Sequence, residues 1–311
     1  MPIPHFDADA VEAATPWTAL IEAIALGFAA PHRAPDRHIH ELAVPGAPDA
    51  TALLMPAWIA GEVYGVKLAN IFPGNGAAGL PAVHALYVVF DGRTGAPRAT
   101  IDGGALTVRR TAATSALAAR HLSRPDSRRL LMIGAGRLAP MLIAAHRTVR
   151  PITEVVVWAR DRGKAARLAG AVGGSVADDL DAAVAATDIV SVATLSHEPL
   201  VRGAALRAGS HVDLVGAFSP RMRESDGDAI SRSSVFIDTE GGARAEAGDL
   251  IQAAAESHFA WDDVRADLTA LIEGRHPGRT TAEEITLFKS VGAAIEDLAA
   301  ARLVLAQGAS S

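Results

Sequence analysis

The sequence of 311 residues contains no cysteine. This absence excludes disulfide bonds, zinc–thiolate sites, iron–sulfur clusters and thiol nucleophiles. An excess of positive charge is also missing, because 29 Lys and Arg stand against 35 Asp and Glu and give a formal net charge of −6. Such a chain has no basic stripe with which to neutralise phosphates, so we expect no nucleic-acid partner.

Long apolar runs are missing as well, since charges, glycine or proline interrupt each one before the ~20 residues of a membrane span. The first residues, MPIPHFDADAVEAA, carry acids and lack the basic-then-apolar order of a secretory signal peptide. We therefore expect a cytoplasmic protein with no membrane partner. Half of the residues are hydrophobic, which is enough for one large core or two cores of medium size.

Two regions of the chain differ in pattern. Residues 1–105 contain a predicted helix at 16–29, a segment rich in Pro and His, and then strand-like runs such as GEVYGVKLANI and HALYVVFDGRTGAPRATI, which indicate an α+β domain with a mainly antiparallel sheet. From about Arg128, the strand-like runs RRLLMIG, TEVVVWA, DIVSVAT, HVDLV and SSVFID alternate with helical sequence. This alternation is typical of a doubly wound parallel sheet. The last helical run, SVGAAIEDLAAARLVLA, comes after this alternation ends. If it packs back on the first domain, that domain is discontinuous.

The segment GAGRLA, Gly134 to Ala139, directly follows a predicted strand and opens a predicted helix. Gly134 would allow the tight turn, and Gly136 would let backbone N–H groups approach a pyrophosphate. Ala139 would permit close packing of helix on strand, and the helix N-terminus would supply partial positive charge. In this context the pattern predicts a dinucleotide site rather than a turn without a ligand.

The end of the next strand bears on the choice of cofactor. NAD sites usually place Asp or Glu at this point, whereas TEVVVWARDRGK offers Ala159 and Arg160, with Arg162 and Lys164 close behind. Asp161 comes late and is predicted to cap the following helix. The sequence therefore favours NADPH, with NADH as the alternative cofactor. The structural alternative is that these basic residues form a solvated helix start.

Three basic residues in the first region are candidates for binding an anion. LTVRRTAATSALAARHL is predicted to start an apolar helix just after Arg109 and Arg110, where arginine opposes the helix dipole. A carboxylate bound at Arg110 would explain its position, and Arg109 fits a solvated surface better. Lys67, in GVKLANIFPGN, is expensive to bury without a partner; alternatively, it extends to solvent.

Four motifs occur together: G-x-K-x-x-N-x-x-P-x-N, L-T-x-x-R-T-A-A-x-S-A-L-A, G-A-G-x-x-A and the terminal F-K-S-V-G-x-A-x-E-D-L-A-A-A. With them the chain resembles the ornithine cyclodeaminase/μ-crystallin family along essentially its full length. The resemblance implies an α/β fold, in which a Rossmann domain with a doubly wound parallel sheet joins an α+β substrate-binding and dimerisation domain built from both chain ends. We place the Rossmann domain at 119–289 and the other domain at 1–118 with 290–311. The resemblance also implies a homodimer.

The resemblance implies that Lys67 and Arg110 bind the substrate carboxylate, and that Arg37, in PDRHIHE, is a looser match to a further carboxylate-binding arginine. Phe218 departs from the pattern, because cyclodeaminases carry an aspartate there, in G-G-D-x-P-G-K. A phenyl ring cannot accept a proton or anchor an ammonium, which argues against cyclodeamination of ornithine. The motif G-A-F-[ST]-P-x-M-R-E is instead similar to the branch of Δ1-pyrroline-2-carboxylate reductases, whose members often accept Δ1-piperideine-2-carboxylate and form L-proline or L-pipecolate with NAD(P)H.

In the expected reaction, Arg110, Lys67 and Arg37 hold the carboxylate of the cyclic imino acid while C2 of its ring receives a hydride. The ring nitrogen needs a proton, for which Lys67, His84 and ordered water are candidates. Phe218 would form an apolar wall that excludes water. His38 and His40 have a metal-like spacing but no third ligand, so no metal site is predicted.

The cofactor is expected to contact the glycine loop and the ends of three strands, at Gly134, Gly136, Arg137, Leu138, Ala139, Arg160, Arg162, Ala193, Thr194 and Gly216. Three alternative functions stay open. They are an ornithine cyclodeaminase that recycles NAD, another ketimine reductase or alanine dehydrogenase, and a non-catalytic NADPH-binding protein. Intact Lys67 and Arg110 argue against the last of these.

Overall fold

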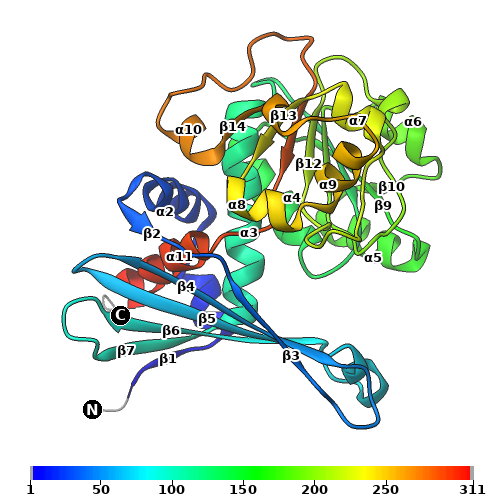
Figure 1. Ribbon diagram of the computed structural model, residues 1–311. Coiled ribbons are helices and arrows are strands. Elements are labelled where there is room, and N and C mark those ends of the chain that lie inside the picture. Colours follow the sequence, from blue (N-terminus) through cyan, green and yellow to red (C-terminus); the bar gives the residue numbers. More distant parts are fainter. Residues whose placement is uncertain (1–2, 309–311) are drawn as a thin grey trace. The chain divides into compact units, whose positions relative to one another are not determined.

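The computed structural model describes residues 3–308, and the chain divides into two compact units (Figure 1). The first unit contains the chain up to Thr111 and again from Ala293, and the second unit is Ala112–Gly292. The first unit therefore contains segments from both ends of the chain. The boundaries between the two units fall after Thr111 and Gly292, whereas the sequence-based domain boundaries were placed after residues 118 and 289. Residues 1–2 and 309–311 of the expected first domain lie outside the described residues.

The first unit contains a seven-stranded sheet. Its strands are β1 (His5–Phe6), β2 (His32–Arg33), β3 (His38–Leu42), β4 (Ala50–Ile59), β5 (Val63–Ile71), β6 (Val83–Asp91) and β7 (Pro97–Asp102). Their order is β1-β7-β6-β5-β4-β2, with β3 also paired to β4, and every pair except β1 with β7 is antiparallel. The prediction of a mainly antiparallel sheet is confirmed.

The first unit also contains helices, of which the first and the last contact the sheet. They are α1 (Ala8–Ala14), α2 (Trp17–Ala29), the 3₁₀ helix η1 (Pro73–Ala78) and α11 (Ala294–Gly308). Helix α11 packs on α2 and on β4 and β5, so the C-terminal segment completes a domain that begins at the other end of the chain (Figure 1). Gly27 makes the helix pair close, because a Cβ there would lie 2.6 Å from the Cβ of Ala299.

Helix α3 (Gly103–Leu122) leads from the first unit into the second. The predicted start just after the paired arginines is wrong, since Arg109 and Arg110 lie inside this helix. The Asp102 carboxylate accepts a 2.7 Å hydrogen bond from the backbone N–H of Ala105 and satisfies one of the donors at the true start. The first turn contains two glycines, which have low helix propensity, so the sequence did not predict a helix start there. The helix dipole therefore gives no reason for the arginines, and their partners must supply it.

The second unit contains an eight-stranded sheet in which every pair is parallel. Its strands are β8 (Arg129–Ile133), β9 (Glu154–Trp158), β10 (Ser175–Val176), β11 (Ile189–Val192), β12 (His211–Leu214), β13 (Ser234–Ile237), β14 (Val264–Asp267) and β15 (Thr286–Lys289). Its helices are α4 (Ala139–Val149), α5 (Arg162–Val172), α6 (Leu180–Ala185), η2 (Gly203–Ala205), α7 (Gly227–Ser231), α8 (Glu240–Glu246), α9 (Gly248–Ala255), η3 (Trp261–Asp263) and α10 (Leu268–Ile272).

The strand order is β10-β9-β8-β11-β12-β15-β13-β14. The chain therefore runs outward from β8 through β9 and β10 and then crosses to β11 on the other side of β8. Ligands of such sheets bind at this reversal, outside the carboxyl ends of the strands. The five predicted strands are confirmed, and the α/β Rossmann prediction with them. Strands β10, β14 and β15, which have four residues or fewer, were not predicted.

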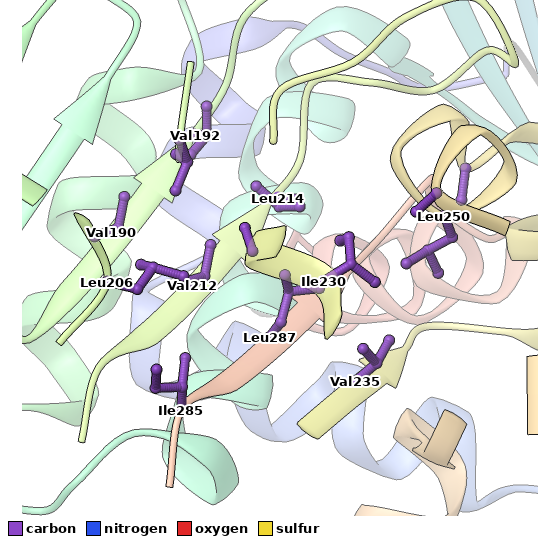
Figure 2. Packing of buried hydrophobic residues seen from close by; sticks show 14 of the residues in the cluster. Val190, Val192, Leu206, Val212, Leu214, Ile230, Val235, Leu250, Ile285 and Leu287 are labelled. Carbon is purple, nitrogen blue, oxygen red and sulfur yellow. The ribbon is translucent and has the colours of Figure 1, made fainter. Parts of the chain in front are cut away.

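Register-matched side chains build the core on one face of this sheet. Val190 of β11 lies opposite Val212 of β12, which lies opposite Leu287 of β15, and Leu287 lies opposite Val235 of β13. Figure 2 shows these side chains with Ile230 of α7 among the buried apolar residues. A continuous apolar face of this kind fixes the register, because a shift by one residue would turn each side chain to the other face. The loops at the strand ends thereby gain a rigid base.

Among residues 3–308, none of the helices combines the length and the apolar character that a membrane span requires.

Candidate active site

Lys67 is buried in the first unit and ion-paired. It lies on the inward face of β5, its side chain is 4% exposed, and its Nζ is 2.7 Å from Oδ2 of Asp297 in α11. The alternative that Lys67 extends to solvent is therefore wrong. A buried ammonium is stable only with a partner of this kind.

Arg110 shares the same carboxylate. Its Nε donates to Oδ1 of Asp297 at 3.0 Å, and its Nη1 donates to Oε2 of Glu296 at 2.7 Å. Asp297 thus bridges Lys67 and Arg110 and fixes both cations with its two oxygens. Neither Glu296 nor Asp297 was predicted to have a role, although two adjacent acids in a mostly apolar helix were a visible signal.

Burial and the neighbouring charges shift the pKa values of the side chains in this cluster. Burial lowers the pKa of Lys67 to about 8 against the opposing effect of Asp297, and Arg110 and Arg37 add to the lowering. Burial alone would also lower the pKa of Arg110, but Asp297 and Glu296 raise it above its usual value. Lys67 and Arg110 thus lie against the carboxylates of Asp297 and Glu296, and the positive charge of Arg37 is close enough to act on Lys67. Such a cluster is suited to a ligand with one carboxylate.

Tyr87 adds a hydroxyl to the inward face. It lies opposite Lys67 in the register of β5 and β6, it is fully buried, and its hydroxyl has no hydrogen-bond partner among residues 3–308. Burial raises the pKa of Tyr87, and Asp297 contributes to that rise. A glycine is needed at position 65, because a Cβ there would lie 2.2 Å from the Tyr87 hydroxyl oxygen. An unsatisfied buried hydroxyl is costly and calls for a functional explanation.

Arg109 does not lie on a solvated surface, and that expectation is corrected. It is buried in the first unit, its Nε donates to Oγ1 of Thr15, and its guanidinium lies 4.3 Å from the ring centroid of Trp17. These contacts stabilise the start of α2. Arg109 therefore has a structural role, whereas its neighbour Arg110 belongs to the charged cluster.

The histidine candidates lie elsewhere on the sheet. His84 is exposed and pairs with Asn70, so it shares the outward face, opposite to Lys67 and Tyr87. This position argues against His84 as a proton donor to a ligand held by Lys67. His38 and His40 are exposed on β3, and the described part of the chain contains no group of acids and histidines that could hold a metal ion.

The glycine loop of the second unit has the geometry that its sequence predicts. Gly134 adopts φ +112, and a Cβ there would lie 2.4 Å from the carbonyl oxygen of Ala193. Gly136 has open space around it, and helix α4 then starts at Ala139 with no side-chain cap on its first N–H groups. The exposed Arg137 and the half-buried Leu138 complete the loop. Uncapped N–H groups beside an open glycine fit a pyrophosphate.

The residues after β9 are solvent-exposed. Asp161 accepts a 3.0 Å hydrogen bond from the backbone N–H of Lys164, which confirms the predicted helix cap. Arg162 is ion-paired with Asp178 on the surface. Arg160 lies two residues after the end of the strand, forms no such ion pair within the described part of the chain, and is the better-placed candidate for a 2′-phosphate.

The carboxyl ends of β11 and β12 lie close together in the second unit. Ala193 and Thr194 follow β11, and a Cβ at Gly216, after β12, would lie 2.1 Å from the carbonyl oxygen of Thr194. Phe218 is 41% exposed and Leu195 is 68% exposed, so two apolar side chains project from these ends.

A model of the ornithine cyclodeaminase/mu-crystallin family matches residues 8–311. The chain belongs to this family. Both the predicted family and the predicted fold class are thereby confirmed, and the lysine and arginine motifs that carry Lys67 and Arg110 lie inside the matched range.

Individual members of the family are similar over nearly the whole chain. The Δ1-pyrroline-2-carboxylate reductase of Paracoccus denitrificans is 39% identical over 288 residues, which cover 91% of this chain and 90% of that protein. The structure of the Thermococcus litoralis Δ1-pyrroline-2-carboxylate reductase with NADH and L-proline has a TM-score of 0.93 at 30% identity and covers 99% of this chain and 98% of that one. An archaeal alanine dehydrogenase dimer with bound NAD has a TM-score of 0.91 at 28% identity, with 100% and 97% covered.

Proposed function

We propose that the protein is an NAD(P)H-dependent imine reductase that converts Δ1-pyrroline-2-carboxylate to L-proline, and Δ1-piperideine-2-carboxylate to L-pipecolate. The observation that carries the proposal is the buried cluster in which Asp297 bridges Lys67 and Arg110, because two basic side chains fixed side by side suit a ligand with one carboxylate. The two reductases named above, from Paracoccus denitrificans and Thermococcus litoralis, support this choice of substrate.

Lys67 and Arg110 hold the substrate carboxylate, and Asp297 keeps both in place. Arg37, half-buried and close enough to lower the pKa of Lys67, adds a third positive charge. With a pKa of about 8, Lys67 carries a proton at neutral pH and can release it without a large cost. Lys67 is therefore our candidate donor of the proton that the ring nitrogen takes up, in place of His84.

A pyridine nucleotide supplies the hydride that reduces the C=N carbon. The glycine loop and the uncapped start of α4 bind its pyrophosphate, while Ala193, Thr194 and Gly216 border its nicotinamide end. Arg160 binds the 2′-phosphate, which makes NADPH the preferred form and NADH the weaker one. Phe218 gives this edge an apolar surface where an aspartate would be needed for ornithine cyclodeamination.

The outward face of the first unit's sheet supports a homodimer. Leu68, Leu86 and Tyr64 share this face and are each at least 37% exposed. Apolar side chains gathered on one sheet face mark an interaction surface. We propose that a second copy of the chain covers it.

The function is tested by NADPH and NADH oxidation with a panel of substrates. Δ1-pyrroline-2-carboxylate and Δ1-piperideine-2-carboxylate are expected to be reduced, faster with NADPH. Pyruvate with ammonia or methylamine tests the alanine dehydrogenase and ketimine alternatives, and ammonia release from ornithine with NAD tests the cyclodeaminase. Activity confined to either of these last arms would overturn the proposal.

A further inference from the structure

One buried carboxylate ties the ends of β11 and β12 together. Glu224 is fully buried; its Oε1 accepts hydrogen bonds from the backbone N–H and the hydroxyl of Thr194 at 2.7 and 2.8 Å. Its Oε2 accepts from the backbone N–H groups of Gly216 and Ala217 at 2.7 and 3.3 Å. The two oxygens therefore serve two different chain segments, one after each strand.

The backbone at Glu224 is itself fixed by hydrogen bonds to a second buried carboxylate. Its backbone N–H and that of Ser225 donate to Oδ1 of Asp249 at 2.7 and 2.9 Å. Oδ2 of Asp249 lies 3.3 Å from Nζ of Lys289, which also donates to the carbonyl oxygen of Leu214 at the end of β12. All three charged side chains are inaccessible to solvent. We call Glu224, Asp249 and Lys289 the loop anchor.

Burial of the loop anchor is not explained by stability. Charged groups are costly to bury even when paired, and apolar side chains of similar size usually fill such a space at lower cost. Burial raises the pKa of Glu224 to about 7, while Lys289 acts in the opposite direction. What the anchor achieves is local order at two segments that otherwise end in open loops.

Those two segments carry the apolar side chains of this edge. Thr194 precedes Leu195, and Gly216 and Ala217 precede Phe218, so the residues that Glu224 binds stand next to the two exposed ones. In a sheet whose strand order reverses at β8 and β11, the half of a dinucleotide beyond the pyrophosphate lies over the strands on the β11 side. The nicotinamide end would therefore meet these two segments.

We infer that Glu224 is a positioning residue for the nicotinamide: it holds the segments 193–196 and 215–218 so that Leu195 and Phe218 form an apolar border for the ring. The inference rests on the proposed function for its reaction but concerns the cofactor alone. Glu224 acts through backbone N–H groups and touches neither cofactor nor substrate. A carboxylate is needed because both of its oxygens accept hydrogen bonds, whereas glutamine has one accepting oxygen and an NH₂ group that would face an N–H donor.

The test compares binding of the two halves of the cofactor to Glu224→Gln. Titration calorimetry with 2′,5′-ADP reports the adenine half and should give an unchanged affinity. Titration with NADPH should give an affinity reduced about tenfold, as expected for one lost link between the segments. The blue shift of NADPH fluorescence on binding, a signature of the nicotinamide environment, should diminish. With imine substrate, kcat should fall more than KM for the imine rises.

Asp188→Asn is the matched control. Oδ2 of Asp188 also accepts two backbone N–H groups, those of Arg128 and Arg129 at 2.8 and 2.9 Å, but next to the first residues of β8 and β11, at the opposite end of these strands. Its loss should lower the melting temperature and leave both affinities and the fluorescence shift unchanged. If Glu224→Gln is too unstable, Thr194→Val removes one hydroxyl donor and should change the same readouts in the same direction.

A folded Glu224→Gln with the wild-type fluorescence shift and NADPH affinity would overturn the inference, as would equal losses in Asp188→Asn. Wild-type protein that shows no NADPH fluorescence shift would overturn it too. Wild-type protein that binds NADPH with the shift but reduces no imine leaves Glu224 as assigned and refutes only the proposed reaction.

Discussion

The sequence contains three lysines, and two of them are buried, Lys67 in the first unit and Lys289 in the second. Lys67 shares Asp297 with Arg110, and a buried hydroxyl beside it has no partner among the described residues. Lys289 lies against Asp249 and acts on Glu224, whose two oxygens accept hydrogen bonds from two chain segments.

The difference shows how burial of charge can serve a ligand or a scaffold. In the first unit, two basic side chains and a hydroxyl without a partner among the described residues lie together, which suits a carboxylate ligand. In the second unit, the oxygens of Glu224 are fully used by backbone N–H and hydroxyl donors. Such a closed cluster orders the backbone around it and has no capacity for a ligand.

The largest expected effect is that of Arg110→Ala on catalysis. Loss of one partner of a buried charged pair formed with a ligand costs about 2–5 kcal/mol of binding, so kcat/KM for the imine should fall by roughly a thousandfold. The dissociation constant of NADPH, followed by fluorescence, should stay close to wild type. Arg109→Gln is the control, because Arg109 is buried next in sequence and contacts Thr15 and Trp17 instead; it should lower the melting temperature and spare kcat/KM. Normal imine reduction by Arg110→Ala would refute the carboxylate assignment.

Asp297→Asn should reduce kcat by about a hundredfold, because the neutral amide no longer fixes both cations. It also tests the proton donor. Asp297 raises the pKa of Lys67, so its removal should move that pKa below the value of about 8. If protonated Lys67 is needed, the alkaline limb of the pH profile of kcat should move to lower pH. An unshifted limb would exclude Lys67 as the donor.

Lys289→Met examines the second cluster through stability. Removal of the cation raises the pKa of Glu224 beyond about 7, whereas the unfolded chain keeps the ordinary value of 4.5. Between pH 4.5 and the pKa of the folded state, Glu224 is protonated in the folded protein and ionised in the unfolded chain. The free energy of unfolding therefore falls as the pH rises through this range, and it falls over a wider range when the folded pKa is higher. Relative to wild type, the free energy of unfolding should be nearly unchanged at about pH 5 and lower by about 1.4 kcal/mol at about pH 8.

The exposed Lys164 provides the control for this measurement. Lys164→Met should show no such dependence of the melting temperature on pH. A deficit of Lys289→Met that is equal at both pH values would show that packing rather than charge accounts for it.

Sequence patterns predicted the parts of the molecule that depend on local order. The long alternating runs predicted β5 to β7, and the glycine loop predicted the start of α4, because strand alternation and tight turns are properties of short segments. Strand β15 was missed because four residues buried on both faces show no alternation. The start of α3 was misplaced because Gly103 and Gly104 are poor helix formers.

The partners of the catalytic candidates could not be predicted in the same way. Lys67 and Asp297 are 230 positions apart, and only the packing of α11 on β5 brings them together. Motif resemblance identified Lys67 and Arg110 as residue types at positions, but it gave neither the bridging role of Asp297 nor the face on which His84 lies. Glu224 stood inside a quoted motif without a role, because its contacts depend on the register of β11 and β12.

The smallest expected effect distinguishes a ligand site from a closed scaffold most directly. Tyr87→Phe removes the buried hydroxyl that has no partner among the described residues, so the free energy of unfolding should stay constant or rise by about 1 kcal/mol. If the hydroxyl instead contacts the substrate, kcat/KM should fall by about tenfold, equivalent to about 1.4 kcal/mol. Tyr64→Phe, at the other tyrosine in the chain and on the outward face, should change neither quantity. Unchanged kcat/KM in Tyr87→Phe would restrict the ligand-binding cluster to its charged members.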